Sequence, residues 1–355
     1  MVEYILIAAT LGLSCSIMTA IRLEKFYLLL PFIVVVSIFT GMRTIDTGTD
    51  TRRYSEIYSD IKPLTEAIST GGFGFEAKRV ETGFVIFASI FRELSLSFNI
   101  FLIGVSFLSI SVFSYAFYRI KIYPSICIFL YTCSVTYLSL HFNIIRQGVS
   151  ASFGLLAISY LLDKKKTKYL TSVIFAISFH SIALFYLLCP FLLRVKWKKW
   201  YAIIFTVLIL LFNYISVLGA IVDFLQPYSI IVWRVGNYFL KHSGEELNLF
   251  SLSLIFDFIL ILYCIIDSDY LRRDEGKFDV ILSIFCFSFL LMILFHDLKL
   301  LALRLSYAFV ILEPILVCFC LRRIKDVSGL FKIIILLSLG SLWFLKNIYI
   351  TAQFL

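Results

Sequence analysis

The sequence predicts an all-α, polytopic membrane protein with about ten transmembrane helices plus one or two re-entrant segments. Composition is the first reason: 61% of the 355 residues are hydrophobic and 15% are charged, against roughly 25% charged residues in soluble domains. The second reason is that the net charge of +9 comes from short basic clusters between apolar stretches. This pattern excludes a soluble enzyme, a disordered scaffold and a nucleic-acid-binding module, and it is typical of a polytopic inner-membrane protein.

Ten apolar stretches approach the roughly 20 residues that a membrane-spanning helix needs. Glu3 precedes the first stretch, and Arg22 and Lys25 follow it. The positive-inside rule therefore places Met1 outside, and this order of charges is the reverse of that in a signal peptide. The predicted spans are 4–21, 26–41, 97–118, 123–140, 144–162, 200–220, 250–267, 279–296, 300–320 and 330–348.

Residues 169–193 form an apolar stretch that does not fit as a simple crossing. Four lysines precede it, and a second group of four bases follows it, so a single crossing would leave one basic cluster outside. We therefore expect a helical hairpin that enters from the cytoplasm and returns, with His180 near its tip. A single long, tilted helix is the alternative.

Residues 82–95 form a second such stretch, which is short and contains Arg92 and Glu93. A topology in which this stretch crosses, Met1 lies inside and the 42–80 loop is cytoplasmic stays open.

We expect one integral membrane domain over residues 1–355, with long outer-face loops at 42–80 and 221–249. The first loop contains the turn-rich TGTDT and STGGFGF stretches, and the second contains the polar run HSGEE. The sequence shows no repeat of helical pairs. This weakens a transporter interpretation, because many transporter folds consist of two related halves.

Three arginines lie at predicted membrane boundaries, where charge is costly and tends to be functional. Arg43 ends the second span, Arg146 begins the span 144–162, and Arg304 lies just inside the span 300–320, all near the outer face. A guanidinium is always charged, and its paired donors suit phosphate oxygens. The three together predict a site for a lipid pyrophosphate. Snorkelling of each side chain to the headgroups is the alternative.

Three residues are candidates for proton transfer, with His180 as the first choice of base and Asp50 and Glu81 in reserve. His180 lies in the apolar segment ISFHSIALF, and a neutral imidazole accepts a proton near pH 7. The alternative for His180 is a packing role. Asp50 follows Gly48 in the polar turn GTDT, where its carboxylate can accept from a sugar hydroxyl or pair with an arginine. Capping of a helix over residues 51–59 accounts for Asp50 equally well.

The sequence leads us to expect no metal and no cofactor. All eight cysteines lie in apolar runs, and neither a CxxC pair nor a Cys/His ligand spacing occurs. A phosphate-loop glycine signature is absent from the sequence. An Asp-x-Asp triplet is typical of transferases that use a metal and a nucleotide sugar. The triplet Asp267-Ser268-Asp269 lies at a predicted cytoplasmic span end, away from the candidate site, so it does not indicate such an enzyme.

Five short motifs follow one another over roughly residues 40–310. They are R-x4-GTD-x3-Y (Arg43, Gly48–Asp50, Tyr54), E-x-GF (Glu81, Gly83, Phe84), IRQG (Ile145–Gly148), FHS (Phe179–Ser181) and RLSY (Arg304–Tyr307). In these motifs and their order the sequence resembles the EpsG family of exopolysaccharide and O-antigen polymerases, the Wzy-type enzymes. One departure is Thr51, where the family more often has an aromatic residue.

The resemblance implies a membrane glycosyltransferase of lipopolysaccharide or exopolysaccharide biosynthesis. Such an enzyme joins undecaprenyl-diphosphate-linked oligosaccharide repeat units at the periplasmic face of the bacterial inner (plasma) membrane, without a metal. The partners implied are the lipid-linked oligosaccharide, the lipid bilayer and a chain-length regulator protein, with no nucleic acid. A flippase or other transporter of lipid-linked sugars and an O-antigen ligase are the alternatives. The expected site comprises His180 and Asp50 for catalysis, Arg43, Arg146 and Arg304 for the pyrophosphate, and Tyr54, Glu81 and Gln147 for the sugar.

Overall fold

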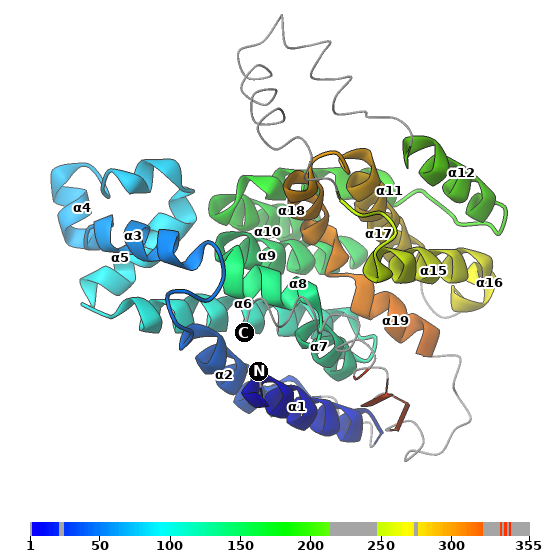
Figure 1. Cartoon of the computed structure of the whole chain (residues 1–355), viewed down its shortest axis with the longest axis horizontal. Helices are drawn as coiled ribbons and strands as arrows, with labels where there is room; N and C mark the ends of the chain where they lie inside the picture. Colours follow the sequence, from blue (N-terminus) through cyan, green and yellow to red (C-terminus); the bar gives the residue numbers. More distant parts are fainter. Residues whose placement is uncertain are drawn as a thin grey trace, which may run out of the picture. The chain divides into compact units, whose positions relative to one another are not determined.

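The computed structural model describes residues 2–20, 25–213, 247–272 and 276–321, together with 334–335, 337–338 and 341. Within these ranges the chain is helical and forms no strand, which confirms the all-α prediction for this part of the protein (Figure 1). The chain divides into two compact units, residues 1–190 with 324–355 and residues 191–323. One membrane domain over the whole chain stays a prediction.

The number of spans is smaller than predicted in the part of the chain that the structure describes. Three helices are long and apolar enough to cross a membrane, or five if each of two bent helix pairs is one span. The two helix pairs are bent by 69° and 46°. The remaining apolar helices of the described residues have only 10–17 residues, short of the roughly 20 that a crossing needs. Most of the predicted span 330–348, the end of the predicted span 200–220 and most of the outer loop 221–249 lie outside the described residues. The long helices are α6 (Phe98–Ile120), α9 (Ile145–Leu162) and α17 (Lys277–Leu294), and the bent pairs are Pro124–Thr132 with Val135–Asn143 and Lys299–Val310 with Glu313–Leu321.

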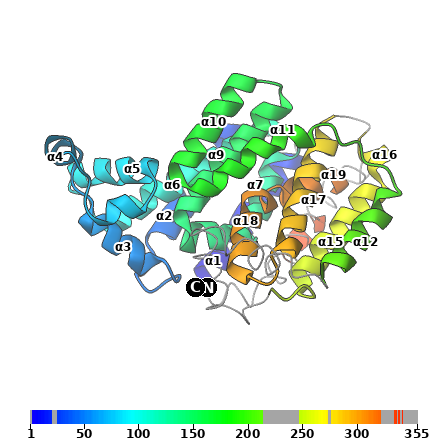
Figure 2. The same cartoon turned by 90° about the horizontal axis from the view of Figure 1, so that it is seen from above.

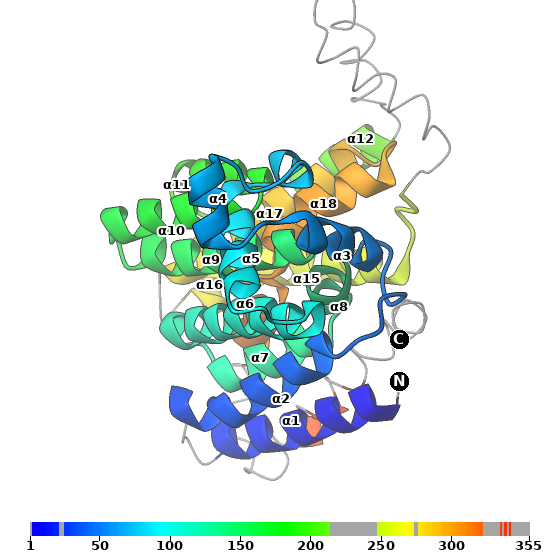
Figure 3. The same cartoon turned by 90° about the vertical axis from the view of Figure 1, so that its left-hand side faces the viewer.

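The first unit is built around α6 and α9, which contact each other. Helix α6 also contacts α2 (Leu30–Gly41) and α7 (Pro124–Thr132), and α7 contacts α1 (Val2–Ala20) (Figure 3). Ser97 begins α6 by accepting a hydrogen bond on Oγ from Ile100 N at 3.4 Å, which satisfies one of the free N–H groups of the first turn. The chain between α7 and α9 forms α8 (Val135–Leu138) and a short π-helix, η3 (Ser139–Asn143).

The region predicted as an outer loop at 42–80 contains short helices rather than irregular chain. Glu93, at the end of the last helix of this group, accepts hydrogen bonds from the backbone N and the hydroxyl of Thr65 at 3.0 and 2.9 Å. Arg92 donates from Nε to Ile61 O at 3.1 Å. The two charges within 82–95 thus bind the backbone of this helical group. Its elements are α3 (Thr51–Asp60), α4 (Leu64–Thr70), η2 (Glu76–Arg79) and α5 (Thr82–Glu93) (Figure 1).

The chain reverses direction at His180. Helix α10 (Lys166–Phe179) lies beside α9 and ends where His180 takes an extended conformation, with φ −161° and ψ 132° (Figure 2). The 3-10 helix η4 (Ser181–Leu188) then returns along α10, so that Tyr169 Oη donates to Tyr186 O at 2.6 Å. One straight helix would separate these residues by roughly 25 Å, so the long, tilted helix is wrong. The cytoplasmic location of both ends stays a prediction.

The second unit is centred on α17, which contacts four other helices of this unit. Helices α15 and α19 also contact each other, and α12 contacts α15 (Figure 2). The neighbours of α17 are α12 (Tyr201–Asn213), α15 (Leu252–Ile266), α18 (Lys299–Val310) and α19 (Glu313–Leu321).

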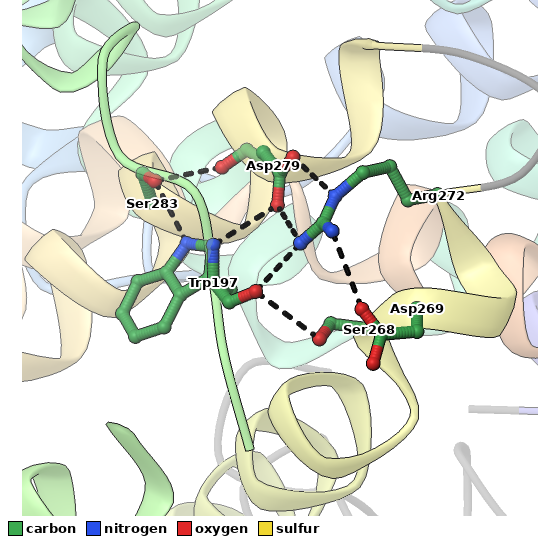
Figure 4. A network of polar contacts seen from close by, with 6 residues as sticks. All are labelled: Trp197, Ser268, Asp269, Arg272, Asp279 and Ser283. Atoms are coloured by element: carbon green, nitrogen blue, oxygen red, sulfur yellow. Dashed lines mark hydrogen bonds and ion pairs between the residues drawn. The ribbon is translucent and has the colours of Figure 1, made fainter. Parts of the chain in front are cut away.

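A polar network binds Trp197 to the start of α17 in the second unit (Figure 4). Arg272 donates from Nε and Nη2 to the two carboxylate oxygens of Asp279 at 2.6 and 3.0 Å, and from Nη2 to Trp197 O at 2.6 Å. The Trp197 indole donates to Ser283 Oγ at 2.9 Å. Asp269 accepts from Arg272 Nη1 at 3.4 Å, so one acid of the Asp267-Ser268-Asp269 triplet belongs to this network.

Candidate functional site

Four of the five motifs meet in the first unit, because their apolar residues share one core. Tyr54, Phe84, Ile145 and Phe179 come from four different motifs and belong to a single cluster of buried side chains. The rings of Tyr54 and Phe84 lie 5.8 Å apart. This packing brings α3, the start of α5, the start of α9 and the end of α10 together, and with them the polar residues of the same motifs.

Arg146 and Glu81 form an ion pair across this junction. The carboxylate of Glu81 accepts from Arg146 Nη1 through Oε2 and from the backbone N of Ser181 through Oε1, the latter at 3.1 Å. Each of the two charged side chains is 22% exposed. The Arg146 guanidinium lies 5.9 Å from the centre of the Tyr54 ring. Three of the predicted site residues therefore lie together, with the turn after His180 beside them.

Arg43 is held differently, by neutral groups. It is 7% exposed and donates from Nη1 to Thr40 O at 3.1 Å and to His141 O at 2.8 Å. Its Nε donates to Thr51 Oγ1 at 3.3 Å, and its Nη2 finds no hydrogen-bond partner among the described residues. None of the described carboxylates forms an ion pair with Arg43. A buried charge without a counter-ion costs of order several kcal/mol, so this position suits an anion that binds from outside the protein.

The π-helix η3 joins the Arg43 region to the Arg146 region. A Cβ on Gly48, whose φ is +78°, would lie 2.3 Å from Phe142 O. A Cβ on Gly148 would lie 2.3 Å from Leu140 O. Only glycine permits both approaches, so the glycines of the GTD and IRQG motifs seat these two segments against the backbone of η3. π-Helical turns are frequent at functional sites.

Asn143, the last residue of η3, fixes the position of Asp50. Its Oδ1 accepts from Asp50 N at 2.9 Å and from Thr49 Oγ1 at 2.8 Å. Asp50 is the N-cap residue of α3, yet its carboxylate makes no capping hydrogen bond in the structure. Capping therefore does not explain this side chain, which is half-buried. A role for Asp50 in catalysis stays a prediction.

His180 accepts a hydrogen bond on Nδ1 from Ile182 N at 3.2 Å, which caps the start of η4. From this bond we assign the neutral ring its proton on Nε2, because Nδ1 serves as the acceptor. In this tautomer Nε2 donates a hydrogen bond. Acceptance of a proton at Nε2 would require the other tautomer and would break the bond to Ile182. The geometry thus favours donation over the base role that the sequence suggested.

Three further predicted site residues, Tyr54, Gln147 and Arg304, show no contact among the described residues that tests their expected roles. Tyr54 and Gln147 are buried, 4% and 1% exposed, so their contacts here are with the protein interior, and sugar contact stays a prediction. Arg304 is an exposed residue of α18 in the second unit, so its convergence with Arg43 and Arg146 stays a prediction. No group of three or more His, Cys, Asp or Glu side chains arranged for a metal ion is found in the described ranges.

The sequence analysis missed the segment 139–143, although it contributes Asn143 and the carbonyl of His141 to the site. The available signal was the polar His-Phe-Asn directly before IRQG. Inside an apolar stretch these three residues indicate only the end of a span. The residue types do not show that the helix widens to a π-helix there.

A model of the EpsG family matches residues 25–355. The chain belongs to the EpsG family. It is also similar to the amylovoran biosynthesis protein AmsC of Erwinia amylovora, with 22% identity over 350 residues that cover 94% of this chain and 88% of that protein. No solved structure matches the chain. The resemblance seen in the motifs is thereby confirmed, and it supports a polysaccharide-polymerase role at the level of the family.

For this member of the EpsG family, the structure gives a reason for the spacing in E-x-GF. A Cβ on Gly83 would lie 2.4 Å from Ser178 Oγ and 2.7 Å from Ser178 O. The start of α5 therefore approaches the end of α10 more closely than any other residue at position 83 permits. Glu81, two residues earlier, lies beside Ser181 as a result, and Phe84 enters the core.

Proposed function

We propose that the protein joins undecaprenyl-diphosphate-linked oligosaccharide repeat units into O-antigen or exopolysaccharide at the periplasmic face of the bacterial inner membrane. The growing chain moves from its lipid to the non-reducing end of a new lipid-linked unit. The observation that carries this proposal is Arg43, a buried guanidinium with neutral partners only, a few residues from Asp50 and joined through η3 to Arg146.

In the proposed reaction, a hydroxyl oxygen of the acceptor sugar attacks the anomeric carbon of the donor. The bond between that carbon and the pyrophosphate oxygen breaks, and the electron pair leaves with the lipid pyrophosphate. Arg43 and Arg146 stabilise the negative charge that develops on the leaving group, without a metal. Fixed donors are effective here because they need no reorganisation during the reaction.

The hydroxyl proton passes to Asp50, which becomes the first choice of base because His180 Nδ1 is occupied. His180 donates from Nε2 to the acceptor sugar, and Tyr54 and Gln147 shape the sugar side of the site. A chain-length regulator protein is the proposed partner. Attack at one face of the sugar ring and departure from the other predict inversion of the anomeric centre.

Analysis of surface polysaccharide on gels from a deletion strain tests the proposal against its alternatives. Loss of a polymerase leaves single-unit lipopolysaccharide, loss of a ligase leaves no polymer attached, and loss of a flippase leaves the units on the inner side of the membrane. Purified protein in vesicles with the lipid-diphosphate-linked unit should then form a ladder of products and release the lipid pyrophosphate. A deletion strain with a normal polymer ladder would contradict the proposal.

A further inference from the structure

We propose that Glu81 is a positioning residue that holds Arg146 and the turn after His180 in one fixed arrangement. This inference rests on the proposed function and deepens it, because it replaces the sugar contact expected of Glu81 with a role that acts through its neighbours. One carboxylate oxygen of Glu81 pairs with Arg146 at the start of α9. The other accepts from Ser181 N at the start of η4. A single side chain on α5 thus joins two other helix starts.

Glu81 makes these bonds instead of capping its own helix. It is the N-cap residue of α5, a position where Ser, Thr, Asp and Asn commonly accept from the first free N–H groups and where the longer glutamate can reach other elements. In the structure its side chain makes no such capping bond, while its backbone O accepts from Val85 N at 3.2 Å. The carboxylate is therefore directed away from α5 and towards α9 and η4.

Glu81 and His180 together complete the start of η4. The first N–H groups of a helix lack partners within the helix. Glu81 accepts from Ser181 N at 3.1 Å, and His180 Nδ1 accepts from Ile182 N at 3.2 Å. If the carboxylate is lost, Ser181 N–H loses its partner and the turn can rotate. Such a rotation would shift the His180 ring, and the same loss would release the Arg146 guanidinium.

Both oxygens of Glu81 are occupied by donors, which is unfavourable for a proton acceptor. A base needs a free lone pair directed at the substrate, whereas Oε2 faces a guanidinium and Oε1 faces a backbone N–H. The pair is nevertheless 22% exposed, so a substrate phosphate can compete for the Arg146 donors. Glu81 therefore orients Arg146 before the anion arrives.

Glu93 provides a matched control at the other end of the same helix. Its carboxylate also accepts from the backbone N–H at a helix start, that of Thr65 at 3.0 Å, and from the Thr65 hydroxyl. Among the described residues it forms no ion pair with an arginine, and it contacts α4 rather than η4. Glu93→Gln and Glu93→Ala thus repeat the chemical change in the same helix without touching Arg146 or Ser181.

The kinetic test uses polymerisation in vesicles, with protein amounts matched by immunoblot. Glu81→Gln keeps an oxygen for Ser181 N but loses the charge that holds Arg146. The KM for the lipid-linked donor should rise about tenfold or more, the size of one lost bond to a charged group, with kcat nearly unchanged. Glu81→Asp should recover part of this loss. The double variant Glu81→Gln/Arg146→Gln should be no worse than Arg146→Gln, because Glu81 acts through Arg146.

The structural test does not depend on activity. Hydrogen exchange of the segment that contains Ser181 and Ile182 should be faster in Glu81→Ala than in the wild type and unchanged in Glu93→Ala. Unchanged exchange in Glu81→Ala would overturn the inference, even if the wild type proved to have no polymerase activity. Glu81 would be a base instead if kcat fell 100-fold or more in Glu81→Gln and if, in the double variant, this loss multiplied with the loss caused by Arg146→Gln. An inactive wild type with faster exchange would contradict the proposed function alone.

Discussion

Arg43 binds a carbonyl of η3 and Arg146 follows η3 in the chain, yet the two are held in opposite ways. Arg146 pairs with the carboxylate of Glu81 and is partly exposed. Arg43 is almost completely buried and donates to two backbone carbonyls and a hydroxyl, with the ring of Phe142 5.6 Å from its guanidinium carbon. One arginine is neutralised by the protein, and the other keeps its full positive charge.

The difference separates two tasks that look identical in the sequence. A guanidinium bound by neutral groups is oriented but not neutralised, so it attracts an anion with its whole charge. A guanidinium paired with a carboxylate exchanges one negative partner for another, and it gains less from the exchange. We therefore expect Arg43 to contribute more than Arg146 to the binding of a pyrophosphate.

Arg43→Lys should give the largest effect, a decrease in polymerisation rate of roughly 10²–10³-fold, the size measured for loss of one fixed donor to a developing oxyanion. An ammonium keeps the charge but cannot maintain the fork between Thr40, His141 and Thr51. Polymer formed per unit time, at matched membrane abundance, measures the effect. Arg52→Lys is the control, since Arg52 pairs with Asp46 on the surface and both side chains are over 70% exposed. A loss of equal size in Arg52→Lys would show a general effect of arginine removal.

His180→Asn and His180→Gln should separate donation from proton acceptance. The amide oxygen of Asn can replace Nδ1 as the acceptor for Ile182 N, but the side chain has no donor at the position of Nε2. Activity should therefore fall by up to about 10²-fold in His180→Asn, the upper end of the cost of one lost hydrogen-bond partner. Gln can place its amide N–H near the position of Nε2 and should retain more activity than Asn. Product ladders from both variants decide the matter, and an equally complete loss in both would favour His180 as the base over Asp50.

Arg146→Lys should give a smaller decrease, about tenfold, chiefly as a higher KM for the donor. Lysine retains the charge and can still pair with Glu81. It lacks the planar fork of donors with which the guanidinium can bind a second acceptor at the same time. Initial rates over a range of donor concentrations give KM and kcat separately. A decrease larger than that of Arg43→Lys would reverse the ranking and show that the paired arginine carries the main charge of the site.

Glu93 should give the smallest effect, a change in stability with pH but not in activity at pH 7. The backbone and hydroxyl bonds from Thr65 lower the pKa of Glu93 below its usual value. A lowered pKa in the folded state means that the stabilisation is present above about pH 4.3, the unfolded value, and is lost as pH falls through the folded value. Thermal unfolding at several pH values should show a wild-type advantage over Glu93→Gln that vanishes in acid. An advantage that grows in acid would contradict the assignment.

The sequence was sufficient to predict the helical class, the membrane character and the residues of the motifs. Composition and the spacing of basic clusters carry the first two, because transfer of polar groups into a membrane is costly at any position of the chain. The hairpin at His180 could also be predicted from the sequence, because basic clusters on both sides of 169–193 disfavour a single crossing. In the part of the chain that the structure describes, fewer spans are found than predicted, because hydropathy registers neither a bend of 69° within an apolar stretch nor the shortness of the helices that form there.

The pairing of charges depended on the three-dimensional arrangement. Arg43 and Arg146 have the same side chain, and Asp46 and Asp50 follow Arg43 closely in the sequence, whereas the acid nearest to Arg146 is Asp163. Yet Glu81 pairs with Arg146, 65 residues away, and Arg43 binds a carbonyl of η3, 98 residues away. These contacts exist because Gly83 permits α5 to approach α10 and because Gly48 and Gly148 permit two segments to contact η3. A guanidinium acquires its role from the groups that packing places around it, and local sequence patterns do not contain that information.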